Sequence, residues 1–367
     1  MLPVLTFEPI CKERIWGGRN LKKLYGKALP PGLPIGESWE ISDRPGDESL
    51  VAAGPCKGMT LRQIMEERPA DLIGHLPMMP KRFPLLLKII DAREKLSLQV
   101  HPPALQAAQL GGEPKTEMWY VVQAGPAAEL FAGLKRGVTR AEFEKQLARG
   151  AVADCFHRIP VKAGDALFLP SGRVHAIGAE TMIFEIQQNS DTTYRVFDWN
   201  RLDAAGRPRP LHLAQSLASI DFADFEPSLV PAATFPGHPG TIRPLVHDKL
   251  FQVSLRRLEP GGALALPGGR MTILAVVEGA LRINAGGAAT VLSPGGFCLI
   301  PASCAEAEAQ AERISVFEEP RLGGSLALPR GEAGRRSSGA ADVVAPKQFN
   351  SPAPTQGGVA FLQVQLG

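Results

Sequence analysis

The sequence predicts a mainly β protein with a few short helices, folded as two units. Its 367 residues include 38 Gly and 33 Pro, a share that is typical of many short strands joined by tight turns. Its apolar runs are strand-sized, as in residues 271–277, and none approaches the roughly 18 residues of a membrane span. A chain of this length usually contains more than one domain.

The composition excludes several classes of protein. Hydrophobic residues make up 44% and charged residues 21%, which indicates a folded chain rather than a disordered one. The net charge is only +3, without the large excess of basic residues that is typical of a nucleic-acid-binding protein. The N-terminus shows no secretory signal pattern, and the five cysteines form no CxxC pair and no disulfide framework. These features predict reduced thiols and a cytoplasmic location.

The first half of the chain alternates between strand and helix patterns. Residues 1–57 and 83–101 show short apolar bursts broken by Gly and Pro, as expected for strands and loops. Apolar residues recur at helical spacing over 60–75, where Thr60 can cap the helix. A second helix is predicted over 138–150, with a capping box of Thr139 and Glu142.

The second half is β-rich around one short helix. Strand patterns cover 158–199 and 243–319, a helix is expected over 212–218, and a Pro-rich linker over 222–240. Residues after 320 are Gly, Ser, Ala, Pro and Arg without a period. We therefore expect a first domain over 1–230, a second over 231–320 and a disordered tail over 321–367, of which only 359–366 is apolar enough to dock.

Polar residues alternate along one predicted strand in a way that indicates a metal site. In residues 96–101, Ser97, Gln99 and His101 share one face, opposite three apolar side chains. Three polar side chains on an inner strand face need partners. Gln99 and His101, two positions apart, can bind one ion together.

Two further segments supply matching ligand types. Lys115 and Glu117 share a face of the next strand, and His175 starts a strand after the turn Pro170-Ser171-Gly172. Two imidazoles, one carboxylate and one amide oxygen suit Zn²⁺, although Fe²⁺ or Mn²⁺ can also fit. One carboxylate leaves a divalent site formally +1, so a bound cation stays electrophilic and can polarise a substrate oxygen.

Several motifs carry a resemblance to a known family. The pattern Gly164-x5-Pro170-x-Gly172-x2-His175 matches the second cupin motif, except that Ala179 stands where an Asn often follows. The segments 96–102, 115–120 and 185–195, over roughly residues 5–320, resemble type I mannose-6-phosphate isomerases, the short bacterial branch most closely. The pattern Gly295-x5-Pro301-x-Ser303-x2-Glu306 is a second copy with Glu in place of the ligand His.

The resemblance implies two cupin (jelly-roll β-barrel) domains with short helical insertions, of which the second binds no metal. It implies one Zn²⁺ per chain and the interconversion of mannose 6-phosphate and fructose 6-phosphate. Its motif positions imply metal ligands at Gln99, His101, Glu117 and His175, and pocket residues at Trp16, Ser97, Lys115, Glu185, Asp191 and Arg195.

The chemistry of an aldose–ketose isomerase assigns catalytic roles to only some of these residues. An enediol or enediolate intermediate needs a cation near the oxygens and a base near the carbons. Lys115, whose pKa a nearby metal can lower, and Glu185 are both candidates for the base, and the sequence does not choose between them. Arg195 can bind phosphate bidentately, stabilise the enediolate, or simply pair with Asp191 or Asp198.

Two other function classes fit part of the pattern. Two His and one carboxylate also describe non-haem iron oxygenases, but such chemistry gives no reason for Lys115 and Arg195. A non-catalytic cupin that binds a sugar phosphate is the other alternative. The expected partner is a small phosphosugar, without nucleic acid or membrane. The sequence leaves the oligomeric state open, and a monomer is compatible with it.

Overall fold

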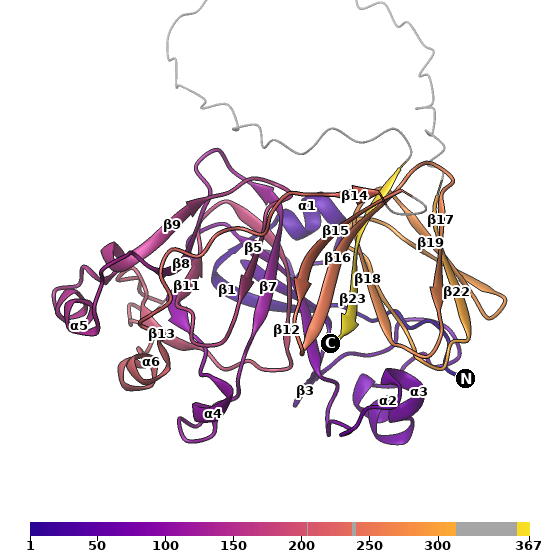
Figure 1. The fold of residues 1–367 in the computed structure, drawn as a ribbon, viewed down its shortest axis with the longest axis horizontal. Coiled ribbons are helices and arrows are strands. Elements are labelled where there is room, and N and C mark those ends of the chain that lie inside the picture. The colour runs from indigo at the N-terminus through magenta and orange to yellow at the C-terminus, as the bar shows by residue number, and fades with distance from the viewer. Residues whose placement is uncertain (204, 237–239, 313–357) are drawn as a thin grey trace, which may run out of the picture.

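Antiparallel strands dominate the structure, as the sequence predicts. The computed structural model describes residues 1–203, 205–236, 240–312 and 358–367. Four large sheets stack face to face in layers, from the indigo and magenta strands of the first half to the orange and yellow strands of the second (Figure 1). In addition, β3 (Asp43–Arg44) and β4 (Asp47–Glu48) form a small hairpin.

The first two sheets enclose one apolar core. Trp119, Val121 and Ile183 from one sheet pack there against Leu130 and Ile177 from the other. The six-stranded sheet has the order β1 (Ile10–Gly18), β2 (Ile35–Ile41), β5 (Leu85–Ala92), β12 (Thr181–Gln188), β7 (Glu117–Ala124), β10 (Ala166–Leu169). The five-stranded sheet has the order β13 (Tyr194–Phe197), β6 (Leu98–Val100), β11 (His175–Ile177), β8 (Glu129–Leu134), β9 (Phe156–Pro160).

The other two sheets enclose a second core. Leu274, Val276, Ile283, Ala309 and Phe361 are among the side chains buried there. One sheet has the order β14 (Phe235–Pro236), β15 (Thr241–His247), β16 (Phe251–Leu258), β23 (Val359–Leu366), β18 (Thr272–Glu278), β21 (Phe297–Ile300). Its partner has the order β17 (Ala263–Pro267), β22 (Glu306–Ala311), β19 (Leu281–Ala285), β20 (Ala288–Leu292).

The apolar end of the predicted tail docks as an interior strand, β23, rather than lying disordered. It pairs with β16 from Phe251 opposite Leu366 to Leu258 opposite Val359, and with β18 on its other side. The reason is that the strand is apolar on both faces: Phe361 enters one core and Leu362 the other. Positions 313–357 lie outside the described residues. We propose that 231–312 and 358–367 together form the second domain.

The six-stranded sheet of the first half is buried on both faces. Along β12, Ile183 enters the first core, whereas Phe184 and Ile186 point the other way. There they join a third core with residues of β16, β18 and β23, and the rings of Phe184 and Phe297 lie 5.3 Å apart. Three of the charged residues of this sheet, Glu37, Lys88 and Glu185, are buried.

The three predicted helices are present, with one division, and the structure adds two short helices, α1 (Asn20–Tyr25) and α4 (Ala104–Ala107), where no helix is predicted. The helix expected over 60–75 is two helices, because Pro69 lacks the N–H that would continue the first. Thr139 accepts from the backbone N–H of Glu142 at 3.2 Å, which is one half of the expected capping box. The helices are α1 (Asn20–Tyr25), α2 (Leu61–Glu67), α3 (Pro69–Ile73), α4 (Ala104–Ala107), α5 (Arg140–Ala148) and α6 (Leu213–Ser219), with a 3₁₀ turn over Val152–Cys155.

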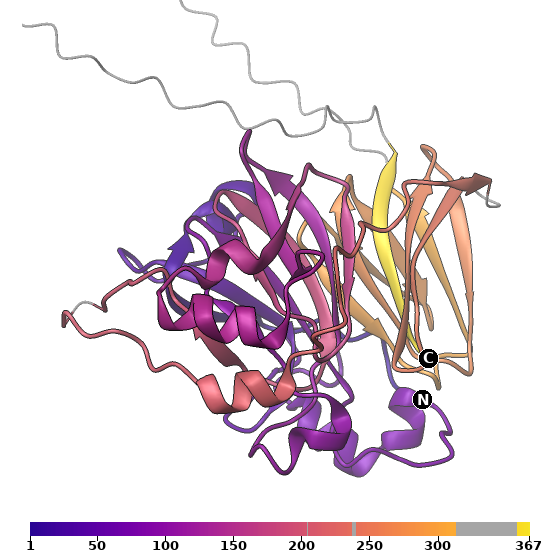
Figure 2. The same ribbon diagram turned by 60° about the vertical axis from the view of Figure 1, so that its left-hand side comes forward.

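Helices α5 and α6 cover the outer face of the five-stranded sheet (Figure 2). Phe143 of α5 is fully buried there against Phe156 and Phe222. None of the described helices is both long and apolar enough to span a bilayer. The pocket-facing strands are thus held between a helical layer on one side and the second pair of sheets on the other.

Candidate active site

The candidate metal ligands come from both sheets of the first half. Gln99 on β6 and His175 on β11 are direct partners across neighbouring antiparallel strands, so their side chains share a face. His101 follows β6, and Glu117 opens β7 on the facing sheet. The alternation of side chains along each strand aims all four into the space between the sheets.

Three of these side chains converge on one point. Glu117 Oε1 lies 3.4 Å from His175 Nε2, and Glu117 Oε2 lies 3.5 Å from His101 Nε2. All three residues are buried, and their ligand atoms lie within 4.8 Å of one another. Gln99 Nε2 lies 3.3 Å from His175 Nε2, and a 180° rotation of the amide would turn its oxygen toward the same point. One cation can be held by this set.

Backbone carbonyls fix both imidazoles in the form that binds metals. His101 Nδ1 lies 2.7 Å from the carbonyl oxygen of Thr192, and His175 Nδ1 lies 2.9 Å from that of Arg173. A carbonyl only accepts, so each Nδ1 carries the proton and each Nε2 offers a lone pair. Burial lowers the pKa of His101 to about 3 and also lowers that of His175. Both rings are therefore neutral at pH 7.

Glu117 has the environment of a carboxylate that binds a cation. Within the described part of the chain, neither of its buried oxygens accepts a hydrogen bond. Lys115 Nζ forms an ion pair with Oε2 at 2.8 Å. Burial acts to raise the pKa of Glu117, but Lys115 and His101 lower it well below its usual value. A buried, ionised carboxylate beside two neutral imidazoles fits a divalent cation, and this donor set suits zinc.

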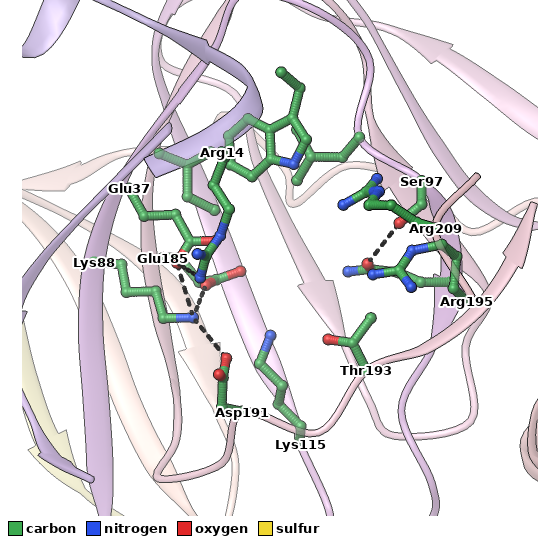
Figure 3. A pocket seen from close by; sticks show the side chains of 14 residues that line it. Arg14, Glu37, Lys88, Ser97, Lys115, Glu185, Asp191, Thr193, Arg195 and Arg209 are labelled. Carbon is green, nitrogen blue, oxygen red and sulfur yellow. Dashed lines mark hydrogen bonds and ion pairs between the residues drawn. The ribbon is translucent and has the colours of Figure 1, made fainter. Parts of the chain in front are cut away.

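A cavity of about 360 Å³ opens beside these ligands. Its two sides differ in charge: Glu37, Lys88, Glu185 and Asp191 lie on one side and Arg195, Arg209, Ser97 and Thr193 on the other, with Lys115 between them (Figure 3). The full lining is Arg14, Trp16, Glu37, Lys88, Ile90, Leu96, Ser97, Gln99, Lys115, Glu185, Asp191, Thr193, Arg195 and Arg209.

Lys115 and Glu185 both face the cavity, and both are buried. The indole N–H of Trp119 donates to Glu185 Oε1 at 2.9 Å, and Lys88 Nζ lies 3.5 Å from Oε2. Burial raises the pKa of Glu185, although Lys115 and Lys88 act in the opposite direction. A carboxyl group with a raised pKa at the wall of a cavity is a candidate for proton transfer.

The pKa of Lys115 is raised in this structure, and a lowered pKa beside a bound metal stays a prediction. Burial acts to lower the pKa, but Glu117 and Glu185 outweigh it and the pKa is raised. A cation bound to Glu117 would compensate part of that negative charge. The structure brings both candidate bases to the cavity and does not separate their roles.

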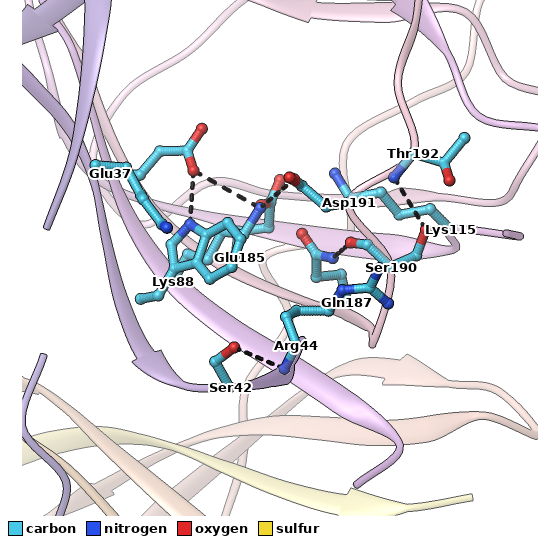
Figure 4. Close-up of polar contacts among 12 residues, drawn as sticks. Glu37, Ser42, Arg44, Lys88, Lys115, Glu185, Gln187, Ser190, Asp191 and Thr192 are labelled. Atoms are coloured by element: carbon cyan, nitrogen blue, oxygen red, sulfur yellow. Dashed lines mark hydrogen bonds and ion pairs between the residues drawn. The ribbon is translucent and has the colours of Figure 1, made fainter. Parts of the chain in front are cut away.

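The loop over 189–192 is held rigidly beside the metal ligands. Arg44 Nη1 donates to the carbonyl of Asn189 at 2.8 Å. Gln187 Nε2 donates to the carbonyl of Ser190 at 2.6 Å (Figure 4). The carbonyl of Thr192 is thereby fixed where it accepts from His101. The same loop presents Asp191 to the cavity, where its carboxylate lies 4.0 Å from Lys88 Nζ.

Glu37 anchors the charged side of the cavity. Arg14 donates to its two oxygens at 3.0 and 3.2 Å, and the indole N–H of Trp39 donates at 2.7 Å. Lys88 Nζ lies 3.9 Å from Oε2. Burial acts to raise the pKa of Glu37, but Lys88, Arg14 and the bond from Trp39 lower it to about 2.

This lowered pKa predicts a loss of stability in acid. An unfolded glutamate titrates near pH 4.3, so Glu37 stabilises the folded state fully above about pH 4.3 and stops doing so as the pH falls toward 2. We expect Glu37→Gln to lower the free energy of unfolding at pH 7 by on the order of 3 kcal/mol. The difference in the free energy of unfolding between the variant and the unaltered protein should shrink as the pH falls from 5 to 2, as measured by urea titrations. The exposed Glu8→Gln is the control; a deficit that stays constant with pH would contradict the prediction.

The comparisons with known proteins identify the family. The model of the type I phosphomannose isomerase catalytic domain matches residues 4–129. A probable mannose-6-phosphate isomerase of Bacillus subtilis (strain 168) is 34% identical over 305 residues, which are 82% of this chain and 94% of that protein. This chain belongs to the type I phosphomannose isomerase family.

A further relative and solved structures agree with this family. The mannose-6-phosphate isomerase of Streptococcus mutans is 42% identical over 218 residues, 59% of this chain and 67% of that protein. The crystal structure of the Bacillus subtilis mannose 6-phosphate isomerase aligns over 99% of both chains, with a TM-score of 0.79 and 27% identity. A mannose 6-phosphate isomerase bound with zinc and yttrium has the same fold, with a TM-score of 0.65 and 16% identity over 84% of this chain and 97% of that one.

The cavity contains most of the residues that the sequence singles out, and four charged ones that it does not. Trp16, Ser97, Asp191 and Arg195 all line the cavity, and Arg195 forms none of the ion pairs recorded among the described residues. The charged residues that sequence reasoning missed are Arg14, Glu37, Lys88 and Arg209. A signal existed for Lys88, which is the one charged residue in the apolar run 83–90.

The second pair of sheets carries no comparable cluster. Within the described residues, the group of His101, Glu117 and His175 is the only set of three or more acidic, His or Cys side chains spaced to hold a metal. Glu306, the residue at the ligand position of the second motif copy, is exposed at the start of β22. That the second unit binds no metal stays a prediction.

Proposed function

We propose that this protein interconverts mannose 6-phosphate and fructose 6-phosphate and uses one Zn²⁺ per chain. The observation that carries the proposal is the convergence of His101, Glu117 and His175 on one point at the edge of a cavity lined by both cationic and carboxylate groups. The names of the Bacillus and Streptococcus relatives support the substrate.

Gln99, His101, Glu117 and His175 would hold the ion. When bound, Zn²⁺ supplies a positive charge that polarises a substrate oxygen and stabilises an enediolate, and no electrons need to leave the sugar. Thr192 and Arg173 orient the two imidazoles through their carbonyls, which keeps the ligand set in place while substrate enters and leaves.

Proton transfer falls to Lys115 or Glu185. Each lies on the cavity wall, and each is a group that can exchange a proton with a sugar carbon or oxygen. Trp119 holds Glu185 in one orientation, and Glu117 holds Lys115. Trp16 is 4% exposed and forms an apolar part of the cavity wall. Ser97 and Asp191 can form hydrogen bonds with substrate hydroxyls.

Two variants distinguish the candidate bases. The two variants are Lys115→Met and Glu185→Gln. We expect the variant that removes the base to lose both turnover and the exchange of the substrate C1 or C2 hydrogen with deuterated solvent. A general-acid catalysis contribution is typically 10²–10⁴-fold, so losses on that order are expected. The other variant should keep the exchange while its turnover falls. Exchange that survives in both variants would exclude both residues as the base.

A coupled assay tests the function itself. Purified protein is given mannose 6-phosphate, and fructose 6-phosphate is followed with and without a chelator and with zinc added back. Activity that disappears with the chelator and returns with zinc is the expected result. Absence of turnover in protein shown by elemental analysis to contain metal would overturn the isomerase proposal and favour a binding role.

A further inference from the structure

Three arginines gather around a single carboxylate at one end of the cavity. Asp198 is 5% exposed and accepts hydrogen bonds from both Arg201 and Arg209. Burial acts to raise the pKa of Asp198, but these bonds lower it overall, so it is ionised at pH 7. Arg195 lies next to this group, and the charge of Arg209 helps burial to lower its pKa. One negative charge thus faces three positive ones.

Arg195 has unused donors in this environment. Its Nη1 donates to the carbonyl of Pro210 at 2.7 Å, but its Nε is buried and has no hydrogen-bond partner within the described residues. Leaving such a donor unpaired is costly unless a ligand satisfies it. Arg195 is paired in register with Gln99, so it borders the metal ligands as well as the cavity.

Arg209 and Arg201 contact the same carboxylate but differ in where they lie. Arg209 donates to both Asp198 oxygens, from Nε at 2.7 Å and from Nη2 at 2.5 Å, which leaves Nη1 outside the pair. It lines the cavity beside Arg195 (Figure 3). Arg201 instead donates to Asp198 and to the carbonyl of Lys95 and is not part of the cavity wall.

We propose that Arg209 binds the phosphate of the substrate together with Arg195, and that Asp198 is a positioning residue that fixes the Arg209 guanidinium. The inference rests on the proposed function, which supplies a phosphate monoester as substrate. Arg195 and Arg209, the two of these arginines that line the cavity, carry two positive charges, which match a phosphate dianion. Guanidinium groups bind phosphate oxygens through paired N–H donors, which fixes the orientation of the sugar.

The test compares Arg209→Met with Arg201→Met, a matched control that removes the other partner of Asp198. Each variant is titrated with inorganic phosphate by calorimetry and assayed with mannose 6-phosphate. Losing charge-assisted hydrogen bonds typically weakens binding roughly ten- to hundredfold, so R209M should raise both the phosphate Kd and the KM by about that factor. R201M should change neither by more than about threefold, and kcat should change less than KM in R209M.

Two results would overturn the proposal: R209M that binds phosphate as well as the unaltered protein, or R201M that loses as much affinity as R209M. If R209M does not fold, Arg209→Lys replaces it. This variant keeps the charge but not the bidentate contact with Asp198, and an intermediate loss of phosphate affinity is expected. The phosphate titration needs no turnover. Failure of the isomerase assay with intact phosphate binding therefore separates the proposed function from the role of Arg209.

Discussion

Replacing His101 with alanine should abolish metal binding and activity while the protein stays folded. The imidazole supplies one of the convergent ligand atoms, and a bound cation contributes several kcal/mol to transition-state stabilisation, so we expect at least a roughly thousandfold loss of turnover. The fold has its own support, because three apolar cores hold the four sheets together. Elemental analysis and the coupled assay measure the two losses.

The stability of the His101→Ala protein separates a catalytic metal from a structural one. The Thr192 carbonyl loses its donor, and an unpaired buried acceptor costs about 1–3 kcal/mol, so a moderate fall in Tm is expected. His157→Ala removes an imidazole outside the metal-ligand group and is the control. A His101→Ala protein that is unfolded as purified would contradict a purely catalytic role.

A charge in the middle of β23 should prevent the chain from folding. Leu362 is fully buried between Leu255 on β16 and Ala275 on β18, in the core shared with the metal-binding half. An isolated carboxylate there has no partner, and such substitutions belong to the rare class that costs more than 4–5 kcal/mol. We expect Leu362→Asp to yield insoluble or unfolded protein, as judged by solubility and circular dichroism.

The neighbouring position provides the control for this prediction. Gln363 is half-buried on β23 and accepts a hydrogen bond from Arg256 at 2.9 Å. A glutamate at this position keeps the acceptor, so Gln363→Glu should fold and keep its activity. A folded, active Leu362→Asp protein would show that β23 can be dispensed with.

The sequence predicts the candidate metal ligands because their signal is local. Gln99 lies on one strand and His101 directly follows it, two positions later, and turn residues precede His175, so alternation along extended backbone aims these side chains inward. Lys88 and Glu37 give a weaker signal. Their sheet is buried on both faces, so its strands lack polar alternation and a single charge does not reveal which face it occupies.

The features that sequence reasoning missed depend on contacts distant in the chain. Arg209 lies outside any strand or helix, and only its pairing with Asp198 and the neighbouring Arg195 brings it to the cavity. The place of β23 depends on pairing with β16, more than 100 residues earlier. Neither periodicity nor composition carries information about such partners.

The core shared by the inner two sheets has a consequence for cooperativity and for motion. Phe184 and Ile186 of the catalytic sheet are buried with Phe251, Leu362 and Val364 of the other half, so neither half can separate without exposing apolar surface to water. A large apolar interface, such as the one these described residues form, disfavours hinge motion between domains. Both halves should therefore melt in a single calorimetric transition, and substrate access should depend on side chains and loops at the cavity mouth rather than on rigid-body opening.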